Sequence, residues 1–210
     1  MSNLQAITDI LITGDADKLK QLVQEALDSG LVADDILQKG LIFGMDIVGE
    51  KMESGEMFIP EVLMAARAMS EAVSILKPLL AEEEAGSVGK VVIGTVKGDL
   101  HDIGKNLVRM MVESGGLEVI DLGVDVSPET FVQAIKDNKP KIVGLSALLT
   151  TTMPMMRETI KIIDENGLRD HLKIMVGGAP VTQAFADEIS ADGYAADAGS
   201  ASKLAKTLIN

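Results

Sequence analysis

The sequence predicts a two-part protein: a four-helix bundle followed by an α/β domain with a five-stranded parallel sheet. Its 210 residues are enough for one large domain or two small ones. Residues 1–89 show only helical periodicity, whereas the later residues alternate short β-branched runs with amphipathic stretches. Charge divides at the same place, because residues 1–89 carry 16 acidic and 6 basic side chains and residues 90–210 carry 16 and 13.

The first part reads as four helices joined by short turns that contain Gly or Asp. Apolar residues recur at three- and four-residue steps, and in the last helix one such stripe predicts a bundle core, with Pro60 suited to the first turn. The predicted helices are Leu4–Ile12, Ala16–Leu27, Ala33–Met52 and Ile59–Leu80, and the stripe is Ile59, Leu63, Ala66, Met69, Val73, Leu76 and Leu80.

The second part reads as strands and helices in alternation. This order predicts βαβ crossovers and a parallel sheet covered by helices on both faces. The predicted strands are Lys90–Val96, Glu118–Leu122, Lys141–Ser146, Lys173–Val176 and Tyr194–Ala196, and the predicted helices are Ile103–Ser114, Pro128–Asp137, Pro154–Asn166, Thr182–Ser190 and Ala201–Leu208.

An acidic run followed by small residues separates the two parts. Glu82, Glu83 and Glu84 precede the segment Ala85–Gly89, whose composition is typical of a linker. We therefore expect a helical domain at residues 1–84, a linker at 85–89 and an α/β domain at 90–210.

Composition argues against several classes of function. The net charge is −13 and aromatic residues make up 2%, so nucleic acids and anionic membrane surfaces are poor partners. The absence of Cys excludes a disulfide scaffold, a Cys-ligated metal and a thiol nucleophile. The N-terminus lacks the features of a signal peptide, and no apolar run approaches the ~20 residues of a membrane helix. We expect a cytoplasmic protein.

Ligands of parallel sheets bind beyond the carboxyl ends of the strands. The first loop there contains His101, with Asp99 two residues before it. Asp99 could accept one ring N–H of His101 and leave the other ring nitrogen for a metal. Alternatively, His101 is a surface residue and Asp102 caps the next helix. The loops expected at this edge are 97–104, 123–127, 146–152, 177–181 and 197–200.

Two nucleotide-binding motifs can be excluded in this first loop. A phosphate-binding loop needs Ser or Thr after Gly-Lys, but Gly104 and Lys105 are followed by Asn106. A Gly-x-Gly-x-x-Gly dinucleotide fingerprint is also absent from the sequence.

Two further loops offer features that suit a ligand. The third strand ends at Ser146 and is followed by the hydroxyl run Thr150–Thr152. The fourth ends in Gly177 and Gly178, where absent side chains let a ligand approach the backbone. Three loops of one crevice thus supply a candidate metal ligand, hydroxyl donors and a slot.

These three elements resemble the signature of the cobalamin-binding family: Asp-x-His-x-x-Gly, Ser-x-Leu and Gly-Gly. Gly104 and Ser146 are separated by 41 residues and Leu148 and Gly177 by 28, which is similar to the base-off, His-on group. The segments 55–61 and 65–69 resemble the helical cap that precedes the corrinoid domain in methionine synthase and in corrinoid proteins of methyl-transfer systems. The resemblance implies a helical cap and a Rossmann-like (flavodoxin-like) cobalamin-binding domain.

The resemblance also implies roles for single residues. His101 would be the lower axial ligand of cobalt in place of dimethylbenzimidazole, Asp99 would hold His101, and Thr152, where the family usually has Ser, would extend this chain. Met52, in place of an aromatic, and Ile59 would cover the methyl face, with the bundle core as the alternative for both. The other implied cofactor-binding residues are Gly98, Leu100, Asp102, Ile103 and Gly104 around His101, Ser146 and Thr150 at the nucleotide tail, Leu148, Gly177 and Gly178 along its slot, and Ala179.

The implied function is a cobalamin-carrying subunit of anaerobic one-carbon metabolism, not a catalyst alone, which alternates between methylcobalamin and Co(I) cobalamin. The implied class is the corrinoid proteins that serve methylamine, methanol or aryl methyl ether methyltransferases. Its implied partners are a substrate-specific methyltransferase, a second methyltransferase acting on a thiol or a tetrahydropterin, and a corrinoid reductive activator. The acidic first half would steer basic partner surfaces.

Two alternatives stay open. A cobalamin-dependent regulator or light sensor fits less well, because the chain has no Trp, no His before His101 and no basic arm. A receiver-like signalling module needs a phospho-acceptor Asp where Ser146 stands. The second histidine, His171, is expected at the surface away from the crevice.

Overall fold

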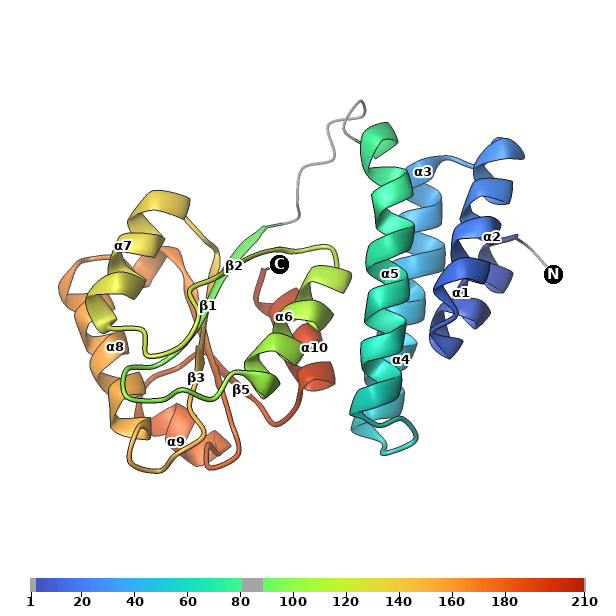
Figure 1. Cartoon of the computed structure of the whole chain (residues 1–210). Helices are drawn as coiled ribbons and strands as arrows, with labels where there is room; N and C mark the ends of the chain where they lie inside the picture. Colours follow the sequence, from blue (N-terminus) through green and yellow to red (C-terminus); the bar gives the residue numbers. More distant parts are fainter. Residues whose placement is uncertain (1–2, 81–88, 210) are drawn as a thin grey trace. The chain divides into compact units, whose positions relative to one another are not determined.

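The computed structural model describes residues 3–80 and 89–209, which form two compact units. One unit contains helices α1 to α5 and also includes Ser114–Gly116, and the other contains the sheet (Figure 1). The predicted linker at 85–89 lies outside the described residues except for Gly89, so the limits of the two domains stay predictions. Within the described ranges, the helices are all too short or too polar to span a bilayer.

The first unit contains the four predicted helices. Helices α1 (Asn3–Thr13) and α2 (Ala16–Asp28) are followed by a long helical stretch and then by α5 (Ile59–Leu80). The long stretch is continuous but not uniform: α3 (Ala33–Asp35) leads through the π-helical turn Ile36–Ile42 into α4 (Phe43–Glu53). The bundle architecture is therefore confirmed, and the π-helical turn is a feature that the periodicity did not predict.

The apolar stripe predicted for α5 is only partly correct. Ala66, Met69 and Leu76 are buried as predicted, but Ile59 is 47% exposed and Leu63 41% exposed. The side chain of Leu80 lies outside the described residues. The prediction followed the large aliphatic residues, whereas much of the buried surface of α5 comes from small residues that allow close helix packing. The buried residues missing from the predicted stripe are Val62, Ala65, Ala68 and Ala72.

The second unit contains a five-stranded sheet whose strands are all parallel, in the order β2-β1-β3-β4-β5. This is the topology of a Rossmann-like domain, and the predicted fold class is confirmed. Each predicted strand is present with ends shifted by no more than a residue or so. The strands are β1 (Lys90–Thr95), β2 (Glu118–Asp121), β3 (Ile142–Ser146), β4 (Lys173–Gly177) and β5 (Gly193–Ala195).

Helices cover both faces of this sheet, as Figure 1 shows. Alternate residues of β1 point to opposite faces: Val92 packs with residues of α7 and α8, and Val91 packs with residues of α6 and α10. Both faces are therefore apolar, as the β-branched runs predict. The helices are α6 (Ile103–Ser114), α7 (Pro128–Asn138), α8 (Met153–Glu165), α9 (Gln183–Glu188) and α10 (Ala198–Ile209).

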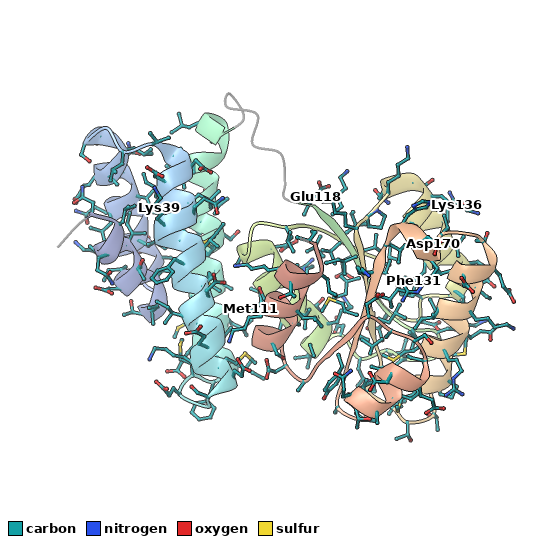
Figure 2. The ribbon with its side chains drawn as sticks, turned by 180° about the vertical axis from the view of Figure 1, so that it is seen from behind. Lys39, Met111, Glu118, Phe131, Lys136 and Asp170 are labelled. Carbon is teal, nitrogen blue, oxygen red and sulfur yellow. The ribbon has the colours of Figure 1, made fainter. Side chains whose placement is uncertain are left out.

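Close packing of α7 against β1 helps to fix the edge of the sheet that carries the predicted ligand loops. Phe131 of α7, labelled in Figure 2, is fully buried. A Cβ at Gly94 of β1 would lie 2.7 Å from Phe131 Cζ, so the glycine makes room for the ring. Ser127 caps the N-terminus of α7: its Oγ accepts a hydrogen bond from Thr130 N–H at 3.3 Å.

Candidate functional site

The loop after β1 turns one carboxylate inward and leaves one imidazole at the surface. Gly98 has φ +84°, a left-handed conformation that glycine adopts without a steric penalty. Beyond this turn, Asp99 is fully buried, whereas the side chain of His101 is 50% exposed. Thr95 Oγ1 donates to the carbonyl of His101 at 2.9 Å and so ties the loop to the end of β1.

Asp99 binds its own loop through one carboxylate oxygen. Asp99 Oδ1 lies 2.7 Å from His101 Nδ1 and accepts a hydrogen bond from the His101 backbone N–H at 3.1 Å. The carboxylate therefore contacts both the ring and the main chain of His101. These two contacts restrict the orientation of the imidazole relative to the loop.

The other oxygen of Asp99 binds the loop after β3. Asp99 Oδ2 accepts hydrogen bonds from Leu148 N–H at 2.8 Å, from Leu149 N–H at 3.3 Å and from Thr152 Oγ1 at 2.7 Å. The structure thus brings Thr152, Asp99 and His101 into one hydrogen-bonded chain, although 53 positions separate Thr152 from Asp99. This hydrogen-bonded chain links the loops that follow β1 and β3, two neighbouring strands of the sheet.

The hydrogen bonds to Asp99 determine its charge. Burial raises the pKa of this carboxyl, but hydrogen bonds from the His101 ring, Leu148 N–H and Thr152 outweigh burial and hold the pKa well below its usual range. An ionised carboxylate only accepts hydrogen bonds, so His101 Nδ1 carries the hydrogen in this contact. In the neutral imidazole, Nε2 then keeps the lone pair that can bind a metal.

His101 is suited to bind a metal ion whose other ligands are supplied by a cofactor and not by the protein. The described residues contain no group of three or more His, Asp or Glu side chains that could hold a metal ion, so His101 alone would supply a single bond. Leu100 is 71% exposed and Ile103 78% exposed, and Leu148 and Leu149 are also exposed. These exposed apolar side chains belong to the His101 loop, to the start of α6 and to the loop that binds Asp99. A corrinoid, whose ring supplies four equatorial nitrogens to cobalt, fits one imidazole among exposed apolar residues.

The remaining predicted residues of these loops lie at the same edge of the sheet. A Cβ at Gly104 would meet no atom within 4 Å, so space is open there. Ser146 ends β3 and is half-buried, and Thr150 and Ala179 are exposed. The side chain of Asp102, also exposed, accepts a hydrogen bond from Asn106 Nδ2 at 3.0 Å. Their contacts with a cofactor stay predictions.

Packing within the protein itself explains why glycine occupies Gly177, the last residue of β4, and Gly178, the residue after it. Gly178 has φ +127°, and a Cβ there would lie 1.9 Å from the carbonyl oxygen of Ala147. A Cβ at Gly177 would lie 2.9 Å from the carbonyl oxygen of Ala195. Absent side chains thus let the loop after β4 approach its neighbours in the protein itself. That Gly177 and Gly178 also line a nucleotide slot stays a prediction.

We expect Gly178→Ala to destabilise the protein by about 2–4 kcal/mol, because the new methyl group meets backbone and the left-handed conformation disfavours alanine. Gly104→Ala is the matched control, since its Cβ enters open space. The free energy of unfolding in urea measures both variants. Equal stability of the two would contradict this account of Gly178.

A buried ion pair between the start of α6 and the end of β2 was not predicted from the sequence. The side chain of Lys105, on the first turn of α6, is 1% exposed. Lys105 Nζ donates to both carboxylate oxygens of Asp121 at 2.6 Å and to Asn106 Oδ1 at 2.9 Å, which uses all three of its hydrogens. Asp121 is the last residue of β2. Burial raises the pKa of its carboxyl, but Lys105 and the N–H of Gly123 outweigh burial and lower it.

We expect Lys105→Met to lower the free energy of unfolding by about 2–4 kcal/mol, because it leaves the Asp121 carboxylate largely buried without its main partner. Lys97→Met is the control, since Lys97 is exposed. Urea denaturation of the two variants provides the comparison. A Lys105→Met protein as stable as the control would show that the ion pair adds nothing.

The two predicted cap residues belong to the helical unit. Met52 on α4 is half-buried, and Ile59, the first residue of α5, is exposed. The exposure of Ile59 argues against the bundle core as its environment. Neither residue belongs to the hydrogen-bonded chain described above, and their contact with the methyl face of a corrinoid stays a prediction. His171 is exposed in a 3₁₀ turn before β4, as expected.

Comparisons with known proteins find relatives along nearly the whole chain. Two families, each described as a B12 binding domain, match residues 4–77 and 89–203. A dimethylamine corrinoid protein of Methanosarcina acetivorans is 45% identical over 98% of this chain and 97% of its own length. A crystal structure of a cobalamin-binding protein from Desulfitobacterium hafniense has a TM-score of 0.86 at 34% identity, over 99% of this chain and 98% of that one.

One solved neighbour is part of an assembly. The structure of the methanol:cobalamin methyltransferase complex of Methanosarcina barkeri contains a chain with a TM-score of 0.84 and 32% identity to this one. The match covers 99% of this chain and 79% of that chain. The similarity thus extends across both units of the protein.

Proposed function

Because this chain belongs to the B12-binding family of corrinoid proteins, whose cofactor is cobalamin, we propose that it is the methyl-carrying subunit of a methyltransferase system and that it binds the cofactor base-off and His-on. The observation that carries the proposal is the hydrogen-bonded chain of Thr152, Asp99 and His101, which leaves His101 Nε2 free at an exposed apolar edge.

When bound, the corrinoid supplies a cobalt atom that can accept a methyl group and give it up to a nucleophile. The protein would then hold and orient the corrinoid. Asp99 keeps the hydrogen on His101 Nδ1 and thereby raises the donor strength of Nε2. Thr152 and the N–H groups of Leu148 and Leu149 keep Asp99 ionised and in place.

We assign the other contacts from the family resemblance. Ser146 and Thr150 would bind the displaced nucleotide tail, and Leu148, Gly177 and Gly178 would line its slot. Met52 and Ile59 would cover the methyl face of the ring. Apolar cover of that face would keep water and oxidants away from the reactive cobalt.

The proposed partners are methyltransferases. One would load the methyl group from a methylated amine or an alcohol such as methanol, because one relative is named for dimethylamine and one solved neighbour belongs to a methanol-specific complex. A second would move the methyl group to a thiol or a tetrahydropterin, and a reductive activator would restore inactive protein. Since the carrier serves separate enzymes, the donor would be recognised by the partner and not by this chain.

The test of the carrier function is stoichiometric. Protein loaded with corrinoid in the Co(I) state and mixed with an excess of a methylated substrate and a catalytic amount of its methyltransferase should take up one methyl group per cobalt, with release of the demethylated substrate, and then stop. Addition of an acceptor methyltransferase and its thiol should release that group. Repeated turnover by this chain without a partner, or no uptake with any methylated amine or alcohol system, would contradict the proposal; the latter result would favour a sensor.

A further inference from the structure

Asp125, in the loop after β2, has an unusual backbone conformation. Its φ of +53° is left-handed, which a non-glycine residue adopts only at a steric cost. In the described part of the chain, the other non-glycine residues with positive φ are Lys139, at the C-terminus of α7, and Ser190, directly after α9 and its cap. Left-handed residues are common at such helix ends. Asp125 follows a strand, so its conformation needs another reason.

The hydrogen bonds of Asp125 explain its left-handed conformation, because both its side chain and its backbone bind the His101 loop. Asp125 Oδ1 accepts a hydrogen bond from Gly98 N–H at 2.6 Å. The backbone N–H of Asp125 donates to the carbonyl of Asp99 at 2.9 Å. The left-handed conformation thus presents the side chain and the main chain of one residue to Gly98, which lies in the turn after β1, and to Asp99, which closes that turn through its N–H to the Val96 carbonyl.

The loop that carries Asp125 is itself anchored to α6. Asp121 Oδ1 accepts a hydrogen bond from Gly123 N–H at 2.9 Å, and the same carboxylate binds Lys105. Because α6 begins two residues after His101, these contacts close a ring of interactions around the His101 loop. Of the contacts in this ring, those of Asp125 act directly on Gly98 and Asp99. The contact of Asp121 acts on Lys105, four residues after His101.

We propose that Asp125 is a positioning residue that holds the His101 loop in its ligand-presenting conformation. The inference rests on the proposed role of His101 as cobalt ligand. Without the side-chain acceptor at Asp125, Gly98 N–H loses its partner and the loop samples more conformations. The fraction of bound corrinoid with a nitrogen bond to cobalt should then fall, with no change in the residues that touch the cofactor.

Two substitutions separate the side chain of Asp125 from its backbone conformation. Asp125→Gly keeps the left-handed conformation at no steric cost but removes the acceptor. Asp125→Asn keeps an acceptor oxygen, and asparagine is among the residues that best tolerate this conformation. Lys139→Gly is the matched control, since it also relieves a left-handed residue but lies at the end of α7. None of the three changes is expected to prevent folding.

The measurements are made on protein with and without corrinoid. In the corrinoid-free protein, hydrogen exchange of the Gly98 amide should be about three- to tenfold faster in Asp125→Gly, as expected for the loss of one exposed hydrogen bond. In the cobalt(II) holoprotein, the EPR signal of an axial nitrogen, a three-line splitting, should lose intensity in Asp125→Gly. Asp125→Asn and Lys139→Gly should resemble the wild type in both measurements.

The outcomes distinguish this inference from the proposed function. If the wild-type holoprotein shows no nitrogen splitting, His101 is not the ligand and the proposed binding mode fails. If the wild type shows it and Asp125→Gly is unchanged in both measurements, the positioning role is wrong. An Asp125→Asn protein that behaves like Asp125→Gly would also overturn the inference, because the acceptor is retained there.

Discussion

Replacing His101 with alanine should remove the axial nitrogen from cobalt and weaken corrinoid binding by at least about 100-fold. The loss of a residue that merely supports a metal ligand already costs about 10- to 100-fold in affinity, and His101 would be the ligand itself. The visible spectrum of the bound corrinoid should shift to that of the base-off form. Titration of the corrinoid-free protein with corrinoid, followed by absorbance, measures both effects.

His171→Ala is the matched control for this experiment, because His171 is the second of the two histidines and is exposed in a turn before β4. It should bind corrinoid as the wild type does. If His101→Ala keeps the affinity and spectrum of the control, the corrinoid is held without His101.

Asp99→Asn should leave the imidazole of His101 in place but move its ring hydrogen from Nδ1 to Nε2, the nitrogen proposed to bind cobalt. The asparagine oxygen would face the donors Leu148 N–H, Leu149 N–H and Thr152, so its NH₂ group would face His101 Nδ1. The hydrogen of the ring then moves to Nε2, which loses the lone pair needed for a metal. We expect an affinity loss of about 10- to 100-fold.

The same variant should be less stable than the wild type by about 1–3 kcal/mol, because its NH₂ group also faces the backbone N–H of His101. Asp170→Asn is the control, since Asp170 is exposed in the 3₁₀ turn before β4 and is not one of the residues assigned to the cofactor. Corrinoid titration and urea denaturation test the pair. An Asp99→Asn protein with wild-type affinity would show that the charge of Asp99 does not select the ring nitrogen.

Much of the fold could be predicted from periodicity. The alternation of β-branched runs and amphipathic stretches is strong enough to indicate each strand and helix of the sheet unit, since buried parallel strands are apolar throughout. The π-helical turn at Ile36–Ile42 was not predictable in this way, and the buried face of α5 was predictable only in part. In α5 the buried positions include four alanines, whose small side chains add little to an apolar stripe.

The central part of the site was also predictable, because Asp99 and His101 are neighbours in one loop. Thr152 followed from the family resemblance, and the structure places its hydroxyl 2.7 Å from Asp99. Lys105 and Asp125 were not predictable. A lysine on an amphipathic helix usually faces water, and an aspartate in a loop usually favours a turn. Only the fold brings Lys105 to Asp121 and Asp125 to Gly98.

The most direct test of the proposed cofactor binding is to identify the axial nitrogen itself. The protein is produced with ¹⁵N-labelled histidine, loaded with unlabelled corrinoid and reduced to cobalt(II). If His101 is the ligand, the three-line EPR splitting of a ¹⁴N nucleus becomes a two-line splitting, because ¹⁵N has spin one half. A splitting that stays three-line would show that the corrinoid's own base binds cobalt, and would contradict the base-off, His-on assignment.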